Sequence, residues 1–132
     1  MVTGGREALL NTGGAYIEPT VFAAVDNAMT IAQEEIFGPV VVAISFKDEA
    51  EAIRIANDSI YGLQANIWTR DVSRAHTMAR ALKAGTVVVN NVWGSDITTP
   101  FGGYKQSGIG RDKSLHAIDK YQQVKNTFIQ LD

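Results

Sequence analysis

The chain has 132 residues, of which 45% are hydrophobic and 20% charged, and its formal net charge is -2. This length and composition predict an ordinary globular chain with one domain and a single core. No basic stripe is present, which argues against nucleic acid as a partner. No apolar run approaches the roughly 18 residues of a membrane span, so we expect no membrane partner.

The chain contains no cysteine, and its two histidines lie far apart in the sequence. We therefore expect neither a disulfide framework nor a zinc site, and we assign no metal ligand. The first residues lack the basic and then apolar pattern of a secretion signal. These features favour a cytoplasmic location.

The first part of the chain is rich in turns. Four of the twelve glycines fall in residues 1–14, which predict a short strand end followed by turns. Residues 16–24 are β-prone but are broken at Pro19, which predicts two short extended pieces or one edge strand.

A short helix and a strand are expected next. Asp26 or Asn27 can cap a helix that runs to Gln33 and stops before the Gly-Pro pair at 38–39. Residues 40–46, Val-Val-Val-Ala-Ile-Ser-Phe, form a near-continuous apolar run. Such a run is typical of a strand that is buried on both faces in a parallel sheet.

Two further helices have clear start signals. Asp48 with Glu51 three residues later forms a capping-box pattern. A strand is predicted over 64–69, and Asp71 is predicted to cap the helix that follows it. Gly85 lies where a glycine is expected at the C-terminal end of that helix.

Residues 86–89 are predicted to form the next strand. The alternation of strands and helices indicates an α/β fold, part of a parallel sheet with crossover helices. A long glycine-rich loop is expected over 92–111, and a loop of that length in a compact domain is usually functional or disordered. A short helix over 113–118 and an extended tail over 121–131 complete the prediction.

Residues 34–39 read Glu-Glu-Ile-Phe-Gly-Pro. A buried strand does not require two acids just before it, so the Glu pair is a candidate for function. The alternative is that the pair is only a solvated helix end, as most Glu pairs are. One carboxylate can accept hydrogen bonds from both hydroxyls of a ribose diol. The residues alone do not say which acid would do so.

Residues 100–108 read Pro-Phe-Gly-Gly-Tyr-Lys-Gln-Ser-Gly. A phosphate-binding loop is disfavoured, because no Lys-Ser or Lys-Thr follows glycine and the third glycine of the dinucleotide fingerprint is missing after Gly110. The stretch is more typical of a tight loop that lets backbone pass close to backbone.

Together the two motifs resemble the NAD(P)-dependent aldehyde dehydrogenase family, over nearly the whole chain and over the last quarter or so of a family member. The resemblance implies that residues 1–118 belong to the catalytic domain and that residues 119–132 form an oligomerisation strand. It therefore implies a homo-oligomer assembled through the C-terminal strand.

The resemblance also implies a cofactor, NAD or NADP. By position, Glu35 would hold the nicotinamide-side ribose and Phe37 would pack near the nicotinamide ring. An aromatic wall of this kind positions the cofactor, which itself carries the hard chemistry.

For the aldehyde substrate, the resemblance implies that Phe101 lines a tunnel and that Trp93, Ser95 and Asp96 lie near its mouth. The sequence from Asp96 onward is most like the dehydrogenases of ω-amino aldehydes, including γ-glutamyl-aminobutyraldehyde. Asp96 would pair with a substrate ammonium, or else it is a plain loop aspartate that makes a turn hydrogen bond.

No residue is assigned to catalysis. In the family a Cys thiolate attacks the aldehyde and a Glu acts as general base, and neither group has a match here. His76 and His116 are interpreted as structural. We therefore expect part of an aldehyde-oxidising enzyme that is inactive alone; the alternative is a catalytically dead remnant that acts as an assembly or interaction module.

Overall fold

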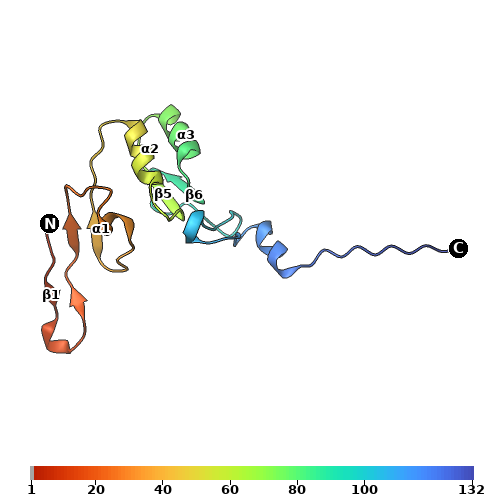
Figure 1. Ribbon diagram of the computed structural model, residues 1–132, viewed down its shortest axis with the longest axis horizontal. Helices are drawn as coiled ribbons and strands as arrows, with labels where there is room; N and C mark the ends of the chain where they lie inside the picture. The colour runs from red at the N-terminus through yellow and green to blue at the C-terminus, as the bar shows by residue number, and fades with distance from the viewer. Residues whose placement is uncertain (1) are drawn as a thin grey trace. The chain divides into compact units, whose positions relative to one another are not determined.

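The computed structural model describes residues 2–132 (Figure 1). The chain divides into two compact units, one that ends at Ser59 and one that runs from Ile60 to Asp132. The expected single core is therefore replaced by two small ones.

The first unit contains six short elements and one helix of nine residues. They are β1 Glu7–Ala8, η1 Leu10–Thr12, β2 Tyr16–Ile17, β3 Thr20–Phe22, α1 Thr30–Gln33, β4 Val40–Val42 and α2 Glu49–Asn57. β1 and β2 pair antiparallel, and β3 and β4 pair parallel with Thr20 opposite Val40. The extended stretch around Pro19 is thus two short strands, one of the two expected arrangements.

Thr20 is the most buried polar residue of this unit, with 2% of its surface exposed. Its hydroxyl donates to the carbonyl of Glu18 at 2.7 Å and accepts from the backbone N–H of Gly5 at 2.8 Å. Because a buried hydroxyl is costly without partners, these two bonds fix the first strands against β3.

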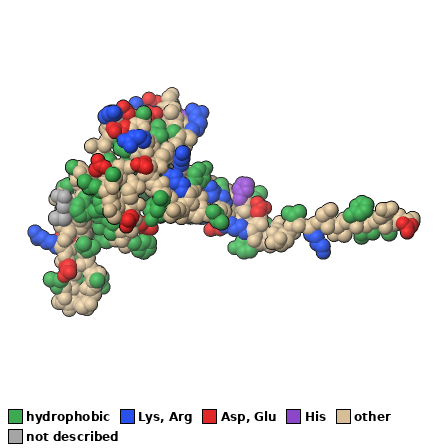
Figure 2. Space-filling view, in the orientation of Figure 1, with side chains coloured by type: hydrophobic (Ala, Val, Ile, Leu, Met, Phe, Trp, Pro, Cys, Tyr) green, Lys and Arg blue, Asp and Glu red, His purple; other side chains and the backbone are tan. Residues whose placement is uncertain are grey.

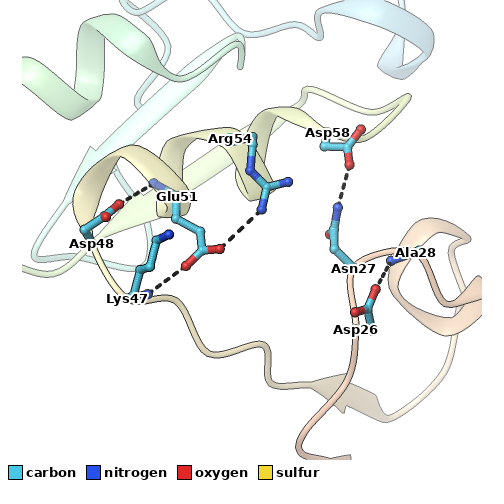
Figure 3. A network of polar contacts seen from close by, with 8 residues as sticks. All are labelled: Asp26, Asn27, Ala28, Lys47, Asp48, Glu51, Arg54 and Asp58. Atoms are coloured by element: carbon cyan, nitrogen blue, oxygen red, sulfur yellow. Dashed lines mark hydrogen bonds and ion pairs between the residues drawn. The ribbon is translucent and has the colours of Figure 1, made fainter.

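The start of α1 differs from the prediction. The helix begins at Thr30 after Met29, and Asp26 instead accepts from the backbone N–H of Ala28 in the preceding turn. Asn27 donates to the Asp58 carboxylate at 2.7 Å (Figure 3). Both residues are used in tertiary or turn contacts and not as helix caps.

The start of α2 follows the predicted pattern in part. The Asp48 carboxylate accepts from the backbone N–H of Glu51 at 2.8 Å. The Glu51 carboxylate returns to the N–H of Lys47 rather than to that of Asp48, and it also pairs with Arg54 at 3.4 Å (Figure 3). Acids in the first turn also suit the positive end of the helix dipole.

The apolar run after Pro39 is not buried on both faces. β4 covers only Val40–Val42, and Val41 is 62% exposed. β4 has one partner strand, β3, and makes no other extensive contact with an element of the described residues. The prediction for residues 40–46 was therefore wrong in length and in burial.

The second unit is built on a strand, a helix and a strand. Its elements are β5 Gln64–Ile67, α3 Val72–Ala81, β6 Thr86–Val89, η2 Lys105–Ser107 and η3 Leu115–Tyr121. β5 and β6 are parallel, with Gln64 opposite Thr86 and Ile67 opposite Val89. α3 packs against both strands and makes the crossover, which confirms the prediction for this part of the chain.

The core of this unit consists of Ile67 from β5, Leu82 at the end of α3 and Val88 from β6. Asp71 caps α3 as predicted, since its carboxylate accepts from the N–H groups of Ser73 and Arg74 at 2.9 and 3.1 Å. These bonds satisfy donors that have no partner inside the helix.

Gly85 does not end the helix. α3 stops at Ala81 with Leu82 in an extended conformation, and Gly85 lies directly against the backbone of Gly102. A methyl group at position 85 would overlap the carbonyl oxygen of Gly102. The carbonyl of Gly62 accepts from both Gly85 and Tyr104, at 3.0 and 2.8 Å, so the glycine-rich loop is fixed to the strands by backbone contacts.

The last part of the unit is irregular. The expected helix over 113–118 is a 3-10 helix, Leu115–Tyr121, because Lys113 and Ser114 both adopt positive φ and cannot start a helix at 113. From Gln122 onward no helix or strand is present, and Figure 2 shows hydrophobic side chains uncovered along this segment.

The α/β class is observed, but the strands of residues 2–132 form three separate pairs instead of one sheet. The structure has the parallel crossover expected between residues 64–69 and 86–89. Among residues 2–132, no helix has the length and apolar character needed to cross a membrane.

We predict that Gly85→Ala will loosen the second unit, because the added methyl group must displace the backbone of Gly102. Overpacking of this kind costs about 1–3 kcal/mol. The amides of Thr86 and Asn90, which bond to β5 and its preceding residue, should exchange with deuterium roughly 5- to 150-fold faster.

The matched control is Val72→Ala at an exposed position of α3. We expect it to change exchange at those amides by less than about threefold, since exposed substitutions usually shift stability within about 0.5 kcal/mol. Equal effects of the two variants would contradict the role assigned to Gly85.

Candidate functional site

A cleft of about 260 Å³ lies in the first unit at the junction of α1 and β4. It is lined by Ile31, Glu34, Glu35, Ile36, Phe37, Gly38, Val40 and Val42. The Glu-Glu-Ile-Phe-Gly motif thus forms most of one wall, and the apolar side chains of β4 form the rest. The two candidate cofactor residues, Glu35 and Phe37, lie in this one cleft.

The cleft exists because α1 ends where the motif begins. Glu34 closes the helix with its N–H bonded to Thr30, and its own backbone is extended. The chain then turns at Phe37, which has φ 55°. A left-handed backbone at a bulky residue is uncommon and costs about 1–2 kcal/mol.

The ring of Phe37 is 92% exposed. Burial in this unit therefore does not compensate for the strained backbone that presents the ring. Strain that persists at an exposed aromatic residue is a feature found at ligand-binding positions.

The Glu35 carboxylate has no hydrogen bond or ion pair to any other residue of the described chain, and it is exposed. A carboxylate in this state can accept two hydrogen bonds from an incoming ligand. The adjacent vicinal hydroxyls of a sugar match that capacity.

The candidate substrate residues lie in the second unit, in the loop that follows β6. Two side chains of β5 hold the start of this loop: Asn66 donates to the carbonyl of Asn91 at 2.8 Å, and Gln64 donates to that of Val92 at 3.1 Å. Trp93 follows directly and is 81% exposed. The loop is therefore anchored at its start while its aromatic side chain stays free.

Lys113 connects two of the predicted residues. Its ammonium donates to the Ser95 hydroxyl at 3.1 Å and lies 5.4 Å from the centre of the Phe101 ring. The latter distance is typical of a cation–π contact. We refer to Ser95, Asp96, Phe101 and Lys113 as the lysine cluster.

Asp96 lies beside this contact but its carboxylate is turned to its own loop. One oxygen accepts from the N–H and the hydroxyl of Thr98 at 2.7 and 2.6 Å. These bonds, with a smaller contribution from Thr99 and the charge of Lys113, lower the pKa of Asp96. The contribution of this turn to stability is complete above the ordinary carboxyl pKa and is lost as the pH falls through the lowered value.

The structure thus shows the turn hydrogen bond that was one of the two readings of Asp96. It brings Ser95 and Phe101 together through Lys113, and it leaves Trp93 outside those contacts. Lys113 was missed by the sequence analysis, since it lies twelve positions after Phe101 in a stretch without a metal or nucleophile pattern. No local sequence pattern indicates it, because its contact with Ser95 spans eighteen positions of the chain.

The fold and the two sites define an α/β chain with an acid-and-aromatic cleft suited to a sugar-linked aromatic cofactor. The model of the aldehyde dehydrogenase family matches residues 1–127. The chain belongs to the aldehyde dehydrogenase family.

Individual relatives agree. The chain is 56% identical over 128 residues to the NADP/NAD-dependent aldehyde dehydrogenase PuuC of Escherichia coli (strain K12). This alignment covers 97% of this chain and 25% of PuuC. It superposes on the aldehyde dehydrogenase KauB from Pseudomonas aeruginosa with a TM-score of 0.92 and 60% identity, over 98% of this chain and 26% of KauB.

A mutant of the P. syringae indole-3-acetaldehyde dehydrogenase AldA, in complex with NAD+ and IAA, superposes with a TM-score of 0.93 and 60% identity, again over 98% of this chain and 26% of that one. The chain spans about a quarter of the length of the relatives that it matches.

We predict that Phe37→Gly will be more stable than Phe37→Ala by about 1 kcal/mol, because only glycine adopts the left-handed backbone without strain. At an ordinary position the order is reversed, since alanine restricts the unfolded chain. Urea denaturation followed by circular dichroism gives the comparison, and a more stable alanine variant would show that position 37 is not strained.

Proposed function

We propose that this chain supplies the nicotinamide-side half of the cofactor site and part of the substrate site of an NAD(P)-dependent aldehyde dehydrogenase that works in the cytoplasm. The observation that carries the proposal is the cleft in the first unit, where the partnerless Glu35 carboxylate and the strained, exposed Phe37 ring share one wall.

The cleft fits part of a dinucleotide. Its volume of about 260 Å³ is slightly below the ~300–1,000 Å³ of complete ligand pockets, so it suits a ribose and its ring rather than a whole cofactor. Glu35 would accept from the two ribose hydroxyls, and Phe37 would set the face of the nicotinamide ring. The chemistry that the cofactor supplies when bound is acceptance of hydride.

The residues of this chain contribute binding and orientation. The apolar side chains of Val40 and Val42 line the cleft beside Glu35. A cofactor that covers this cleft would exclude water from the carboxylate, and its hydrogen bonds would then be stronger than in open water. Phe37 presents an exposed aromatic ring at the same cleft, and contact with that ring would limit the poses of the nicotinamide.

On the substrate side, Phe101 would line the approach of the aldehyde, with Trp93, Ser95 and Asp96 near its outer end. The exposed Trp93 ring offers apolar surface, and Ser95 and Asp96 offer acceptors. Amino aldehydes are the first substrates to test, since the Asp96 carboxylate is exposed and could pair with an ammonium group.

The thiolate that attacks the aldehyde must come from outside these residues, because the chain contains no cysteine. The general base and the pyrophosphate-binding loop must likewise come from elsewhere. We therefore propose that the 132 residues alone do not oxidise aldehydes.

The test uses a hybrid enzyme, the E. coli relative PuuC with its matching quarter exchanged for this chain. We predict that Glu35→Gln will weaken NAD+ binding by about 10- to 100-fold, which corresponds to the loss of a charge-assisted hydrogen bond of about 1.5–3 kcal/mol. The dissociation constant is measured by fluorescence titration.

The matched control is Glu34→Gln, which removes the same charge one position earlier in the same cleft wall. It should change the dissociation constant by less than about twofold to threefold. Unchanged affinity in Glu35→Gln, or equal losses in both variants, would remove Glu35 from the proposed role.

A second candidate function is that of an interaction module that assembles through the C-terminal segment. This segment carries Val124, Phe128, Ile129 and Leu131, all largely exposed and outside any strand. Apolar chain in an extended conformation is prone to pair with another strand. In the first proposal the same segment is the oligomerisation strand, residues 119–132, of a homo-oligomer.

We predict that the chain self-associates and that Val124→Lys shifts it toward the monomer. Light scattering over a concentration series gives the mass, and Lys125→Gln serves as the neighbouring control with no expected change. A monomer at every concentration would exclude assembly through this segment.

A further inference from the structure

The lysine cluster holds a cation in a fixed position. Lys113 is half-buried, and its backbone has φ 58°, followed by φ 51° at Ser114. Two successive left-handed residues without glycine cost energy, so the surrounding contacts must impose this conformation.

Those contacts are backbone hydrogen bonds on both sides of the lysine. Phe101 and Asp112 exchange two of them, at 2.8 and 2.6 Å, and the N–H of Ser114 donates to the carbonyl of Ile97 at 2.8 Å. Lys113 is thereby fixed between the loop that carries Ser95 and the strand-like residue Phe101.

The charge of Lys113 is not neutralised by an ion pair. No carboxylate in residues 2–132 lies within 4.0 Å of its ammonium, since Asp96 faces Thr98 and Asp112 pairs with Lys120. The ammonium has three donors, of which the Ser95 hydroxyl accepts one. The remaining donors are available to a ligand with a negative group.

The simpler interpretation is that Lys113 only fastens the loop through Ser95. For that role a neutral side chain at position 113 that hydrogen-bonds to the Ser95 hydroxyl would suffice. A charged side chain would cost desolvation free energy and would gain nothing from its charge. The cation–π contact with Phe101 places the charge beside the residue that we assign to the substrate approach. A fastening role and a recognition role therefore predict different responses to the charge of the substrate.

We propose that Lys113 is a specificity-determining residue whose ammonium, positioned by Ser95 and Phe101, binds the carboxylate of an aldehyde that carries an acidic group. The inference rests on the proposed function and adds aldehydes with an acidic group to the amino aldehydes considered there. An aldehyde that also carries an amino group would meet Asp96 in the same cluster.

The experiment compares 4-oxobutanoate with its methyl ester in the hybrid enzyme. We expect Lys113→Met to raise the KM for 4-oxobutanoate by about tenfold or more and that for the ester by less than twofold. Lys113→Arg should keep a KM near the starting value, because it retains the charge. Lys125→Met is the control for loss of a distant lysine.

Ser95→Ala separates the two roles, since it removes the fastening bond and leaves the charge. If Lys113 only holds the loop, Ser95→Ala and Lys113→Met will impair both aldehydes to the same degree, and the proposal is overturned. An unchanged KM for 4-oxobutanoate in Lys113→Met would also overturn it.

A hybrid that oxidises neither aldehyde would count against the proposed function, and the inference is then decided on the 132-residue chain itself. Titration with 4-oxobutanoate should shift the amide signals of Ser95, Asp96 and Ser114 in nuclear magnetic resonance spectra, and the methyl ester should not. Equal shifts from both compounds, or none from either, would refute binding of a carboxylate at Lys113.

Discussion

The close approach of the Gly85 and Gly102 backbones is the contact on which the second unit depends. It fixes a long irregular loop to a strand, helix and strand that are themselves small, and the Gly62 carbonyl secures the same loop with two hydrogen bonds. Because Phe101 precedes Gly102, its ring takes its position from this contact. The bridge from Phe101 to Asp112 then places Lys113, and Gln64 and Asn66 anchor the part of the loop that leads to Ser95.

The first unit is distinguished by residues in energetically unfavourable states. Its strands are short. Two of its residues adopt unfavourable states: Phe37 is exposed and has a left-handed backbone, and the Glu35 carboxylate has no partner among the described residues. Neither feature stabilises the unit alone. In the function that we propose, a bound ribose would satisfy the carboxylate and an aromatic ring would cover the phenyl group. The family membership of the chain agrees with this interpretation.

Local signals were predicted from sequence more successfully than tertiary ones. The caps at Asp48 and Asp71 depend on neighbours three residues away or fewer, and the structure has both. The position of Gly85 against Gly102 and the contact of Lys113 with Ser95 depend on residues 17 and 18 positions away, which no local pattern reports. The motif around Glu35 was found through its resemblance to a family, and the cleft that it lines required the turn at Phe37.

The burial expected for residues 40–46 failed for a related reason. An apolar run predicts that something covers it, but not that the cover lies in the same 132 residues. The chain spans about a quarter of the length of its relative PuuC. We therefore propose that this chain contributes binding groups and that the reacting thiolate belongs to residues outside it.

The measurement that tests this division most directly is aldehyde-dependent NADH formation by the 132-residue chain and by the hybrid, assayed side by side at equal concentration. The account predicts steady turnover by the hybrid and none by the chain alone. Turnover by the repurified chain alone would contradict it, as would a correctly folded hybrid that binds NAD+ and forms no NADH with any aldehyde.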